Sequence, residues 1–302
     1  MKKNALKRSE NYHANNIYPN KYLYYYLTPA VVMLVALCAF PLLVLIYNSF
    51  TDMSMVKPVT NFVGLRNFRK LLTNPDFWNR FVTTMKYVVS AVVIEMVLGF
   101  AIALLFQIKL RAKKLLRLII IIPMVAAPVA MCFLWTIMFN PKMGVLNYLL
   151  SLVNISPQMW TSSPDTALFS VILVEIWMNT PFVFLLVSSG MTALPQELFE
   201  AAVMDGAGFW QMLRKMLLPL LSPVLSIAFL FRLQDSFKVF DIIYVLTGGG
   251  PGTATETMNI SIYKTAFQYS RIGSASAQAL LLYIFVFAMS YFIIKRGNIG
   301  FD

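Results

Sequence analysis

Four charged residues recur at three-residue intervals within an otherwise apolar stretch of this 302-residue chain. Their signs alternate along the stretch: Arg232, Asp235, Lys238 and Asp241. Helix residues three or four apart lie on neighbouring turns of one face, so the spacing predicts a ladder of ion pairs, which Gln234 joins through Lys238. Charged groups inside a membrane span are costly, and they face the protein interior or a water-filled cavity. The ladder is therefore either a structural network or the lining of a polar path, and the residues alone support both interpretations.

Two isolated acids lie within neighbouring apolar segments. Glu95 and Glu175 each interrupt a run that is long enough to span a membrane. Both are expected to be paired, structural carboxylates, with a proton relay as the alternative. Asn179 follows Glu175 by four residues, so these two side chains are predicted to share one helix face.

The elements that hold these residues are predicted from long runs without charge. The chain is 59% hydrophobic and only 13% charged, whereas soluble domains carry about 25% charged residues. A helix needs about 20 apolar residues to cross a membrane. Three uncharged runs and three weaker ones reach this length: residues 22–51, 118–141 and 272–294, and residues 82–108, 167–193 and 217–246. The sequence therefore predicts an all-α polytopic membrane protein with six transmembrane helices, the third broken or bent at Pro123 and Pro128.

The net charge of +12 follows the predicted topology rather than a nucleic-acid-binding surface. Basic residues outnumber acids in the tail at 1–21, between 109 and 117, and after the last span. Because Lys and Arg near span ends mark the cytoplasmic side, both termini are expected to be cytoplasmic, with residues 22–302 as one transmembrane domain. The connection at 51–81 is basic too, and its leucine and phenylalanine spacing predicts an amphipathic helix on the outer surface.

A short segment rich in small residues separates the fourth and fifth predicted spans. Residues 194–219 contain Glu200, Ala201 and Ala202, then Asp205 and Gly206, and end at Pro219. The alanines keep a helix thin enough to enter a groove on a partner, and glycine adopts backbone angles that other residues avoid. A helix–turn–helix with its bend at Gly206 is expected. Its second helix would be amphipathic through Phe209, Trp210, Met212 and Leu213.

This segment resembles the EAA loop, the cytoplasmic coupling segment of binding-protein-dependent ABC importers. Its flank from Leu194 to Phe199 is similar to that of the carbohydrate-importing branch. The stretch from Phe237 to Pro251 resembles the sugar-permease pattern. Over roughly residues 60–295 the chain resembles the first permease subunit of importers of the maltose or glycerol-3-phosphate type. The resemblance implies the ABC importer type I permease fold, with a coupling loop that rests in a cleft of an ATPase subunit. The docking residues that it implies are Glu200, Ala201, Ala202, Asp205 and Gly206.

The resemblance also implies an assembly in the bacterial cytoplasmic membrane. Its other members are a second, homologous permease, two ATPase subunits and an external solute-binding protein. ATP and Mg²⁺ are expected on the ATPase, because this sequence contains no Gly-x4-Gly-Lys-Ser/Thr phosphate loop. The chain itself is expected to catalyse no reaction and to bind no cofactor, metal or nucleic acid.

Within such an importer, polar and aromatic residues of the fourth and fifth spans are candidates for a carbohydrate path. A sugar needs hydrogen bonds to its hydroxyls and a flat apolar surface beneath its ring. The candidates are Asn179, Gln234, Asp235, Lys238, Phe240, Asp241 and Tyr244. Two alternatives remain: a permease for another solute such as a glycerophosphate, and an ion-coupled secondary transporter that uses the membrane charges as a relay.

Overall fold

The computed structural model describes residues 20–56, 59–108 and 111–296, which form helices joined by loops, with one isolated β-bridge between Thr51 and Phe62. Almost all of the tail predicted at 1–21 lies outside these residues. Five helices in the described part of the chain are long and apolar enough to cross a membrane, and one bent pair makes a sixth candidate. The six predicted segments thus each correspond to a helix or a helix pair.

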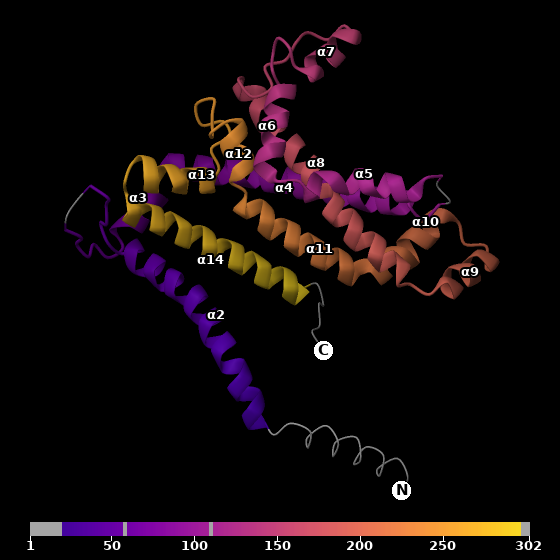
Figure 1. Cartoon of the computed structure of the whole chain (residues 1–302), viewed down its shortest axis with the longest axis horizontal. Helices are drawn as coiled ribbons and strands as arrows, with labels where there is room; N and C mark the ends of the chain where they lie inside the picture. The colour runs from indigo at the N-terminus through magenta and orange to yellow at the C-terminus, as the bar shows by residue number, and fades with distance from the viewer. Residues whose placement is uncertain (1–19, 57–58, 109–110, 297–302) are drawn as a thin grey trace.

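Three long helices form the centre of the molecule (Figure 1): α4 (Pro75–Leu105), α8 (Pro164–Thr192) and α11 (Leu218–Lys238). Both α4 and α8 have a proline in their first turn, where the missing N–H is not needed, whereas Pro219 of α11 lies inside a longer continuous helix. The closest approach of α4 to α8 depends on Gly99. A Cβ atom at this position would lie 2.5 Å from the Cβ of Val183, so a larger residue would push the helices apart.

The first span, α2 (Asn20–Ser49), is apolar all round and lies mostly away from the other helices. Its C-terminal end packs beside α14 (Ile272–Arg296), while its N-terminal end points away (Figure 1). Residues 24–38 are all exposed. A helix that is apolar on every side is stable in a membrane but not in water, which agrees with its prediction as a span.

The third span is broken just before Pro128, as predicted, whereas Pro123 lies within its first helix and does not interrupt it. It consists of α5 (Lys113–Val125) and α6 (Pro128–Met138), which meet at 99°. Ala126 and Ala127 have extended backbone angles between the two helices, and Pro128 begins the second one. Because of this bend, α6 leaves the body steeply and carries α7 (Val145–Leu152) at its far end (Figure 1).

The fifth predicted span, 217–246, is wrong in its bounds. Its helix starts earlier, with α10 (Phe209–Met212) and a π-helical turn (Leu213–Leu217), and continues through α11 to Lys238. Val239 then has an extended backbone, with ψ of 130°, and a separate short helix, α12 (Asp241–Leu246), follows. The sequence did not indicate this break, because neither Val239 nor Phe240 is a residue type that typically ends a helix.

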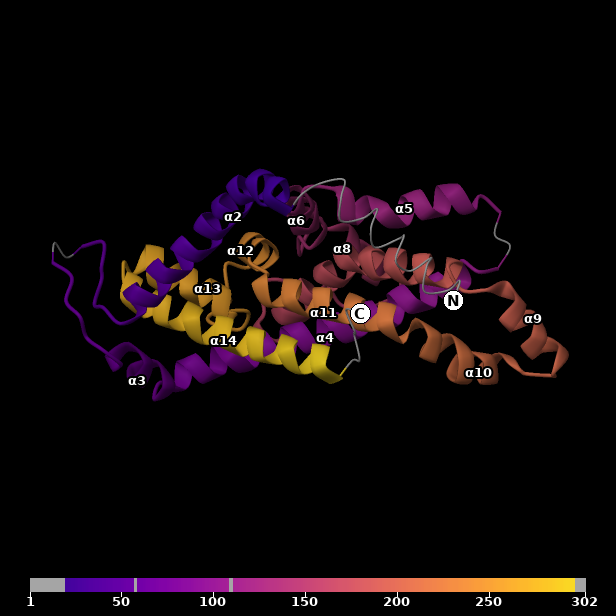
Figure 2. The same ribbon diagram turned by 90° about the horizontal axis from the view of Figure 1, so that it is seen from below.

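Short helices occupy the connections. The amphipathic helix predicted in the first loop is present as α3 (Arg66–Leu72). Before the last span, α13 (Met258–Tyr263) and a π-helical turn (Lys264–Gln268) were not predicted. The coupling segment begins with α9 (Gln196–Met204). Figure 2 shows α9 and α10 at one end of the body and α3 at the opposite end.

Candidate functional site

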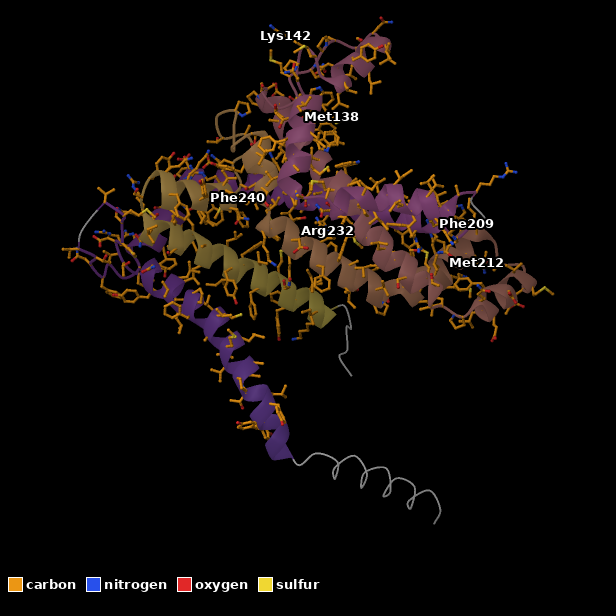
Figure 3. All side chains as sticks on the ribbon, in the orientation of Figure 1. Met138, Lys142, Phe209, Met212, Arg232 and Phe240 are labelled. Carbon is orange, nitrogen blue, oxygen red and sulfur yellow. The ribbon has the colours of Figure 1, made fainter. Side chains whose placement is uncertain are left out.

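The most buried charges in the described structure form one cluster between α4, α8 and α11. Arg232 Nε lies 2.7 Å from Glu95 Oε2, and Arg232 Nη2 lies 2.8 Å from Glu175 Oε1. Arg232 Nη1 also donates a hydrogen bond to Asn179 Oδ1 at 3.2 Å. The three charged side chains are at most 3% exposed. Figure 3 places Arg232 in the middle of the helical body, so this cluster joins three spans at their centre.

The cluster confirms that Glu95 and Glu175 are paired carboxylates, and that Asn179 shares a face with Glu175. Asn179 Nδ2 donates to the Glu175 carbonyl at 3.2 Å while its oxygen accepts from Arg232. Ser236, one turn after Arg232, donates to Glu175 Oε1 at 3.4 Å. Five polar groups on three helices therefore satisfy one another, as buried polar groups must.

The predicted ladder within the fifth span is only partly formed, and this prediction needs correction. Asp235 lies 3.8 Å from Arg232 and 3.9 Å from Lys238, but it is 56% exposed, so both contacts are weak. Asp241 is not on the same helix, because the break at Val239 places it at the start of α12. Arg232 is instead neutralised by acids from other helices, which approach it more closely than its own neighbours do.

Gln234 also departs from its predicted role. Its Nε2 donates to Ser290 Oγ on α14 at 3.1 Å, and it does not join the ladder through Lys238. Gln234 therefore ties α11 to the last span. Of the candidates for a polar path, Asp235, Lys238 and Asp241 are exposed, and Asn179 is partly exposed.

The aromatic candidates meet at the break between α11 and α12. Phe240 and Tyr244 stack with ring centroids 5.0 Å apart and an interplanar angle of 18°. Tyr263 of α13 closes the group at 5.0 Å from Phe240 and 5.2 Å from Tyr244. A hydrogen bond with Tyr244 raises the pKa of Tyr263 above its ordinary value. Tyr244 is 42% exposed, so the group offers a polar-edged aromatic surface.

Tyr263 and its neighbour Phe267, 5.3 Å away, were missed by sequence reasoning. They lie in a connection that contains no long apolar run, and their four-residue spacing was the only local signal. A second missed group is Glu256, which is buried and lies 2.6 Å from Arg80 and 3.0 Å from Lys264. This ionic group fixes the glycine-rich connection after α12 to α4.

The coupling segment has the predicted bend at Gly206. Its φ of +78° is a left-handed value, and no atom lies within 4 Å of where its Cβ would be. Gly206 N donates to Val203 O at 3.0 Å, and Ala207 N donates to Ala202 O at 2.9 Å. These two bonds form a Schellman motif, the usual end of a helix at a left-handed glycine. The glycine is therefore required by the backbone and not by packing.

The two helices of the coupling segment leave much of their surface uncovered. Glu200, Ala201 and Asp205 are exposed, whereas Ala202 is buried at 9% exposure. Large apolar residues are exposed as well, with Met204 at 87% and Trp210 at 67%. Pro195 precedes the first turn of α9 as its N-cap instead of lying within it. The arrangement is an exposed helical hairpin at one end of the body.

The described residues thus form a polytopic helical body with a broken third span and an exposed helical connection between the fourth and fifth spans. A family model described as binding-protein-dependent transport system inner membrane component matches residues 95–297. The chain belongs to this family. The match contains the buried cluster, the coupling segment and the last span.

Curated relatives cover most of the chain. It is 36% identical over 248 residues to the trehalose/maltose transport system permease protein MalF of Thermococcus litoralis, covering 81% of this chain and 83% of the relative. It is 33% identical to the trehalose transport system permease protein SugA of Mycobacterium tuberculosis, covering 88% and 85%. It is 32% identical to the inner membrane ABC transporter permease protein YcjO of Escherichia coli, covering 91% and 93%.

Solved structures show the same fold. A chain of a bacterial ABC transporter involved in the import of the acidic polysaccharide alginate matches with a TM-score of 0.81 and 19% identity, over 98% of this chain and 100% of that one. A chain of an alginate transporter in complex with an alginate pentasaccharide-bound periplasmic protein matches with the same score at 20% identity, over 93% and 96%. The predicted ABC importer permease fold is thereby confirmed.

Proposed function

We propose that this chain is one of two permease subunits in an ATP-driven importer of a carbohydrate delivered by an external solute-binding protein. The observation that carries the proposal is the exposed α9–Gly206–α10 hairpin on a chain of this family. Glu200, Ala201, Ala202, Asp205 and Gly206 are the proposed contacts with an ATPase subunit. The second permease is a related chain, and the two ATPases hold ATP with its Mg²⁺.

The helices connected to the hairpin offer a mechanical route from the ATPase to the membrane. On one side α9 follows α8 directly, and on the other α10 runs without a break into α11 as far as Lys238. Arg232 ties α11 to Glu95 on α4 and to Glu175 on α8. When the ATPases close, movement of the hairpin would therefore carry three spans together. Such rigid-body movement is how alternating access to a central path is achieved.

The proposed path runs along the exposed polar residues of α11 and ends at the aromatic group beyond its break. Asp235 and Lys238 lie one and two turns from the buried cluster and are 56% and 70% exposed. Phe240 and Tyr244 offer ring faces, and Asn179, Gln234 and Asp241 are the other hydrogen-bonding residues proposed for the path. A carbohydrate is favoured as the solute because curated relatives are named for trehalose and maltose transport. A glycerophosphate is the alternative within the same family.

The proposed orientation places both termini and the hairpin in the cytoplasm. The excess of Lys and Arg in the tail and in the connection at 109–117 supports this orientation. It places α3 and the aromatic group towards the external side, since α3 and α9 lie at opposite ends of the body (Figure 2). Reaction of single cysteines at Met204 and at Leu65 with a membrane-impermeant reagent in intact cells tests it. Only the second should be labelled.

Reconstitution of the complete assembly tests the function. Vesicles that contain both permeases, the ATPases and external binding protein should take up labelled trehalose, maltose or a longer glucan only when ATP is supplied on the ATPase side. Glycerol 3-phosphate is the comparison solute. Uptake of the phosphate ester alone would move the proposal to the alternative solute, and uptake without ATP would reject it.

A further inference from the structure

An apolar cavity lies at the end of the body opposite the coupling hairpin. It has a volume of about 330 Å³ and lies between α3, the start of α4, α13 and the middle of α14. Ligand pockets in proteins measure roughly 300–1,000 Å³, so this cavity is large enough for part of a small molecule. Its walls are apolar, with Leu72, Phe77, Trp78, Phe81, Leu281 and Phe285 among them. A ligand that fills it must be a hydrocarbon.

The cavity is open towards the membrane-facing side of α4. Leu72 and Trp78 are 46% and 47% exposed, whereas Phe77 on the inner wall is 5% exposed. Trp78 begins a stripe of exposed apolar residues along α4 that continues through Val82, Val89 and Val93. These positions recur on one helix face. The edge of the cavity therefore continues into an exposed apolar face of a helix that is long and apolar enough to cross a membrane.

Two aromatic rings in the wall of the cavity come from α4 and α14. Phe81 and Phe285 meet edge to face, with 5.0 Å between their centroids. This contact joins the two helices beside the cavity.

Basic side chains surround the outer end. Arg66, Arg69 and Lys70 of α3 are exposed, and none has an ion-pair partner among the described residues. Arg69 precedes Leu72 by three residues and so lies beside the cavity mouth. Asp76 in the first turn of α4 is one acid against these three bases. Trp78 Nε1 donates to Leu72 O at 2.9 Å, which holds α3 and the cavity wall in a fixed relation.

We propose that this cavity binds one acyl chain of an anionic phospholipid whose phosphate is held by Arg69 and Lys70. Hydrocarbon walls, a membrane-facing mouth and adjacent unpaired bases match the two parts of that molecule, because polybasic segments at a membrane surface attract anionic headgroups. A transmembrane helix of a partner protein fits less well. A helix is about 10 Å across, which is more than a cavity of about 330 Å³ accommodates.

Lipid retention by the assembled importer tests this site. The complex is exchanged into nanodiscs of phosphatidylglycerol and phosphatidylcholine in equal amounts, and bound lipid is measured by native mass spectrometry after release. Wild type should retain phosphatidylglycerol at least fivefold over phosphatidylcholine. The double variant Arg69→Glu, Lys70→Glu should lose this preference. Lys142→Glu, an exposed base on the connection before α7, is the matched control and should leave it unchanged.

A cavity-filling variant separates the acyl chain from the headgroup. Leu281→Trp should lower retention of both lipids, with complex yield as its folding control, and Leu281→Phe is the milder replacement if yield falls. Equal retention of the two lipids by wild type would overturn the proposal, as would an unchanged preference in the charge-reversed variant. A photocrosslinker at Leu72 should capture lipid. Capture of the second permease instead would assign the cavity to that interface and overturn the proposal.

Discussion

At the scale of residues, the buried cluster around Arg232 brings together groups that are far apart in the chain. Glu95 precedes Arg232 by 137 positions, and Glu175 precedes it by 57. Sequence spacing reveals partners only within one helix, so it identified Asp235 as the neighbour and could not identify the acids on other spans. The need of each buried acid for a partner was predictable, because an unpaired buried charge is too costly. The identity of that partner depends on how the helices pack.

The cluster contains two acids and one base, so substitutions of its different members should reduce assembly of the importer to different extents. Arg232→Gln leaves both carboxylates without a cation, whereas Glu95→Gln still leaves one acid opposite the arginine. Removal of one partner from a buried pair costs about 3–5 kcal/mol. We expect Arg232→Gln to reduce the yield of assembled importer severely and Glu95→Gln to reduce it much less. Lys238→Gln is the control, because Lys238 is 70% exposed. Equal yields for Arg232→Gln and Lys238→Gln would contradict a stabilising role for the cluster.

The aromatic group should affect transport more than assembly. Tyr244→Ala removes a half-exposed ring that stacks on Phe240, so it takes away part of the proposed sugar path without emptying the core. We expect at least a tenfold lower uptake rate with complex yield close to wild type. Tyr283→Ala, an exposed tyrosine on the last span, should transport normally. Normal uptake by Tyr244→Ala would move the path away from this group.

At the scale of elements, local sequence was a good guide where the backbone itself imposes a conformation. The bend at Gly206 was predicted because glycine adopts backbone angles that other residues avoid. The break before Pro128 was predicted because proline fixes its φ angle and lacks the N–H that a helix needs. The end of α11 at Val239 was not predicted, since neither residue at the break is a helix breaker. The π-helical turns at Leu213–Leu217 and Lys264–Gln268 were likewise not predicted. The spans were therefore predicted in number, but their ends were not.

The hairpin offers a matched pair of glycines. Gly206 has φ of +78° and Gly208 has φ of −75°, and neither has an atom within 4 Å of its Cβ position. A left-handed conformation costs a non-glycine residue about 1–2 kcal/mol. Gly206→Val should thus distort the hairpin and abolish ATP-dependent uptake while membrane insertion is retained, and Gly208→Ala should be tolerated. Co-purification with the ATPase is the direct measurement. Normal co-purification and uptake by Gly206→Val would argue against docking here.

The crossing of α4 and α8 offers a second pair of positions at which a test variant can be compared with a control. Gly99→Val places a side chain where Val183 already lies, and overpacking of this kind typically costs about 1–3 kcal/mol. Ala101→Val introduces a comparable group at an exposed position two residues further on. We expect the first variant to lower the thermal stability of the purified complex and the second to leave it unchanged. A similar melting temperature for both would show that the helices separate without cost.

At the scale of the whole molecule, the chain is expected to depend on its partners for energy. The sequence has no phosphate loop, and the purified chain in lipid should neither hydrolyse ATP nor take up sugar in response to a proton gradient. Addition of the second permease, the ATPases and the binding protein should restore ATP-dependent uptake. Proton-driven uptake by the isolated chain would favour the alternative hypothesis, in which the charged residues of the spans act as the relay of an ion-coupled secondary transporter.

The 99° bend of the third span also has a consequence for how cells make this protein. With 13 residues, α5 measures about 20 Å and is too short to cross a core of about 30 Å. Lipid cannot hydrogen-bond the interrupted backbone near Ala126 and exposed Ala127, so non-helical backbone at membrane depth needs cover from protein. A copy made without the proposed second permease would lack this cover, and we expect it to be degraded. We therefore expect the steady-state amount of this subunit in the cell to depend on how much of the second permease is made. Faster translation of this subunit alone should not raise that amount.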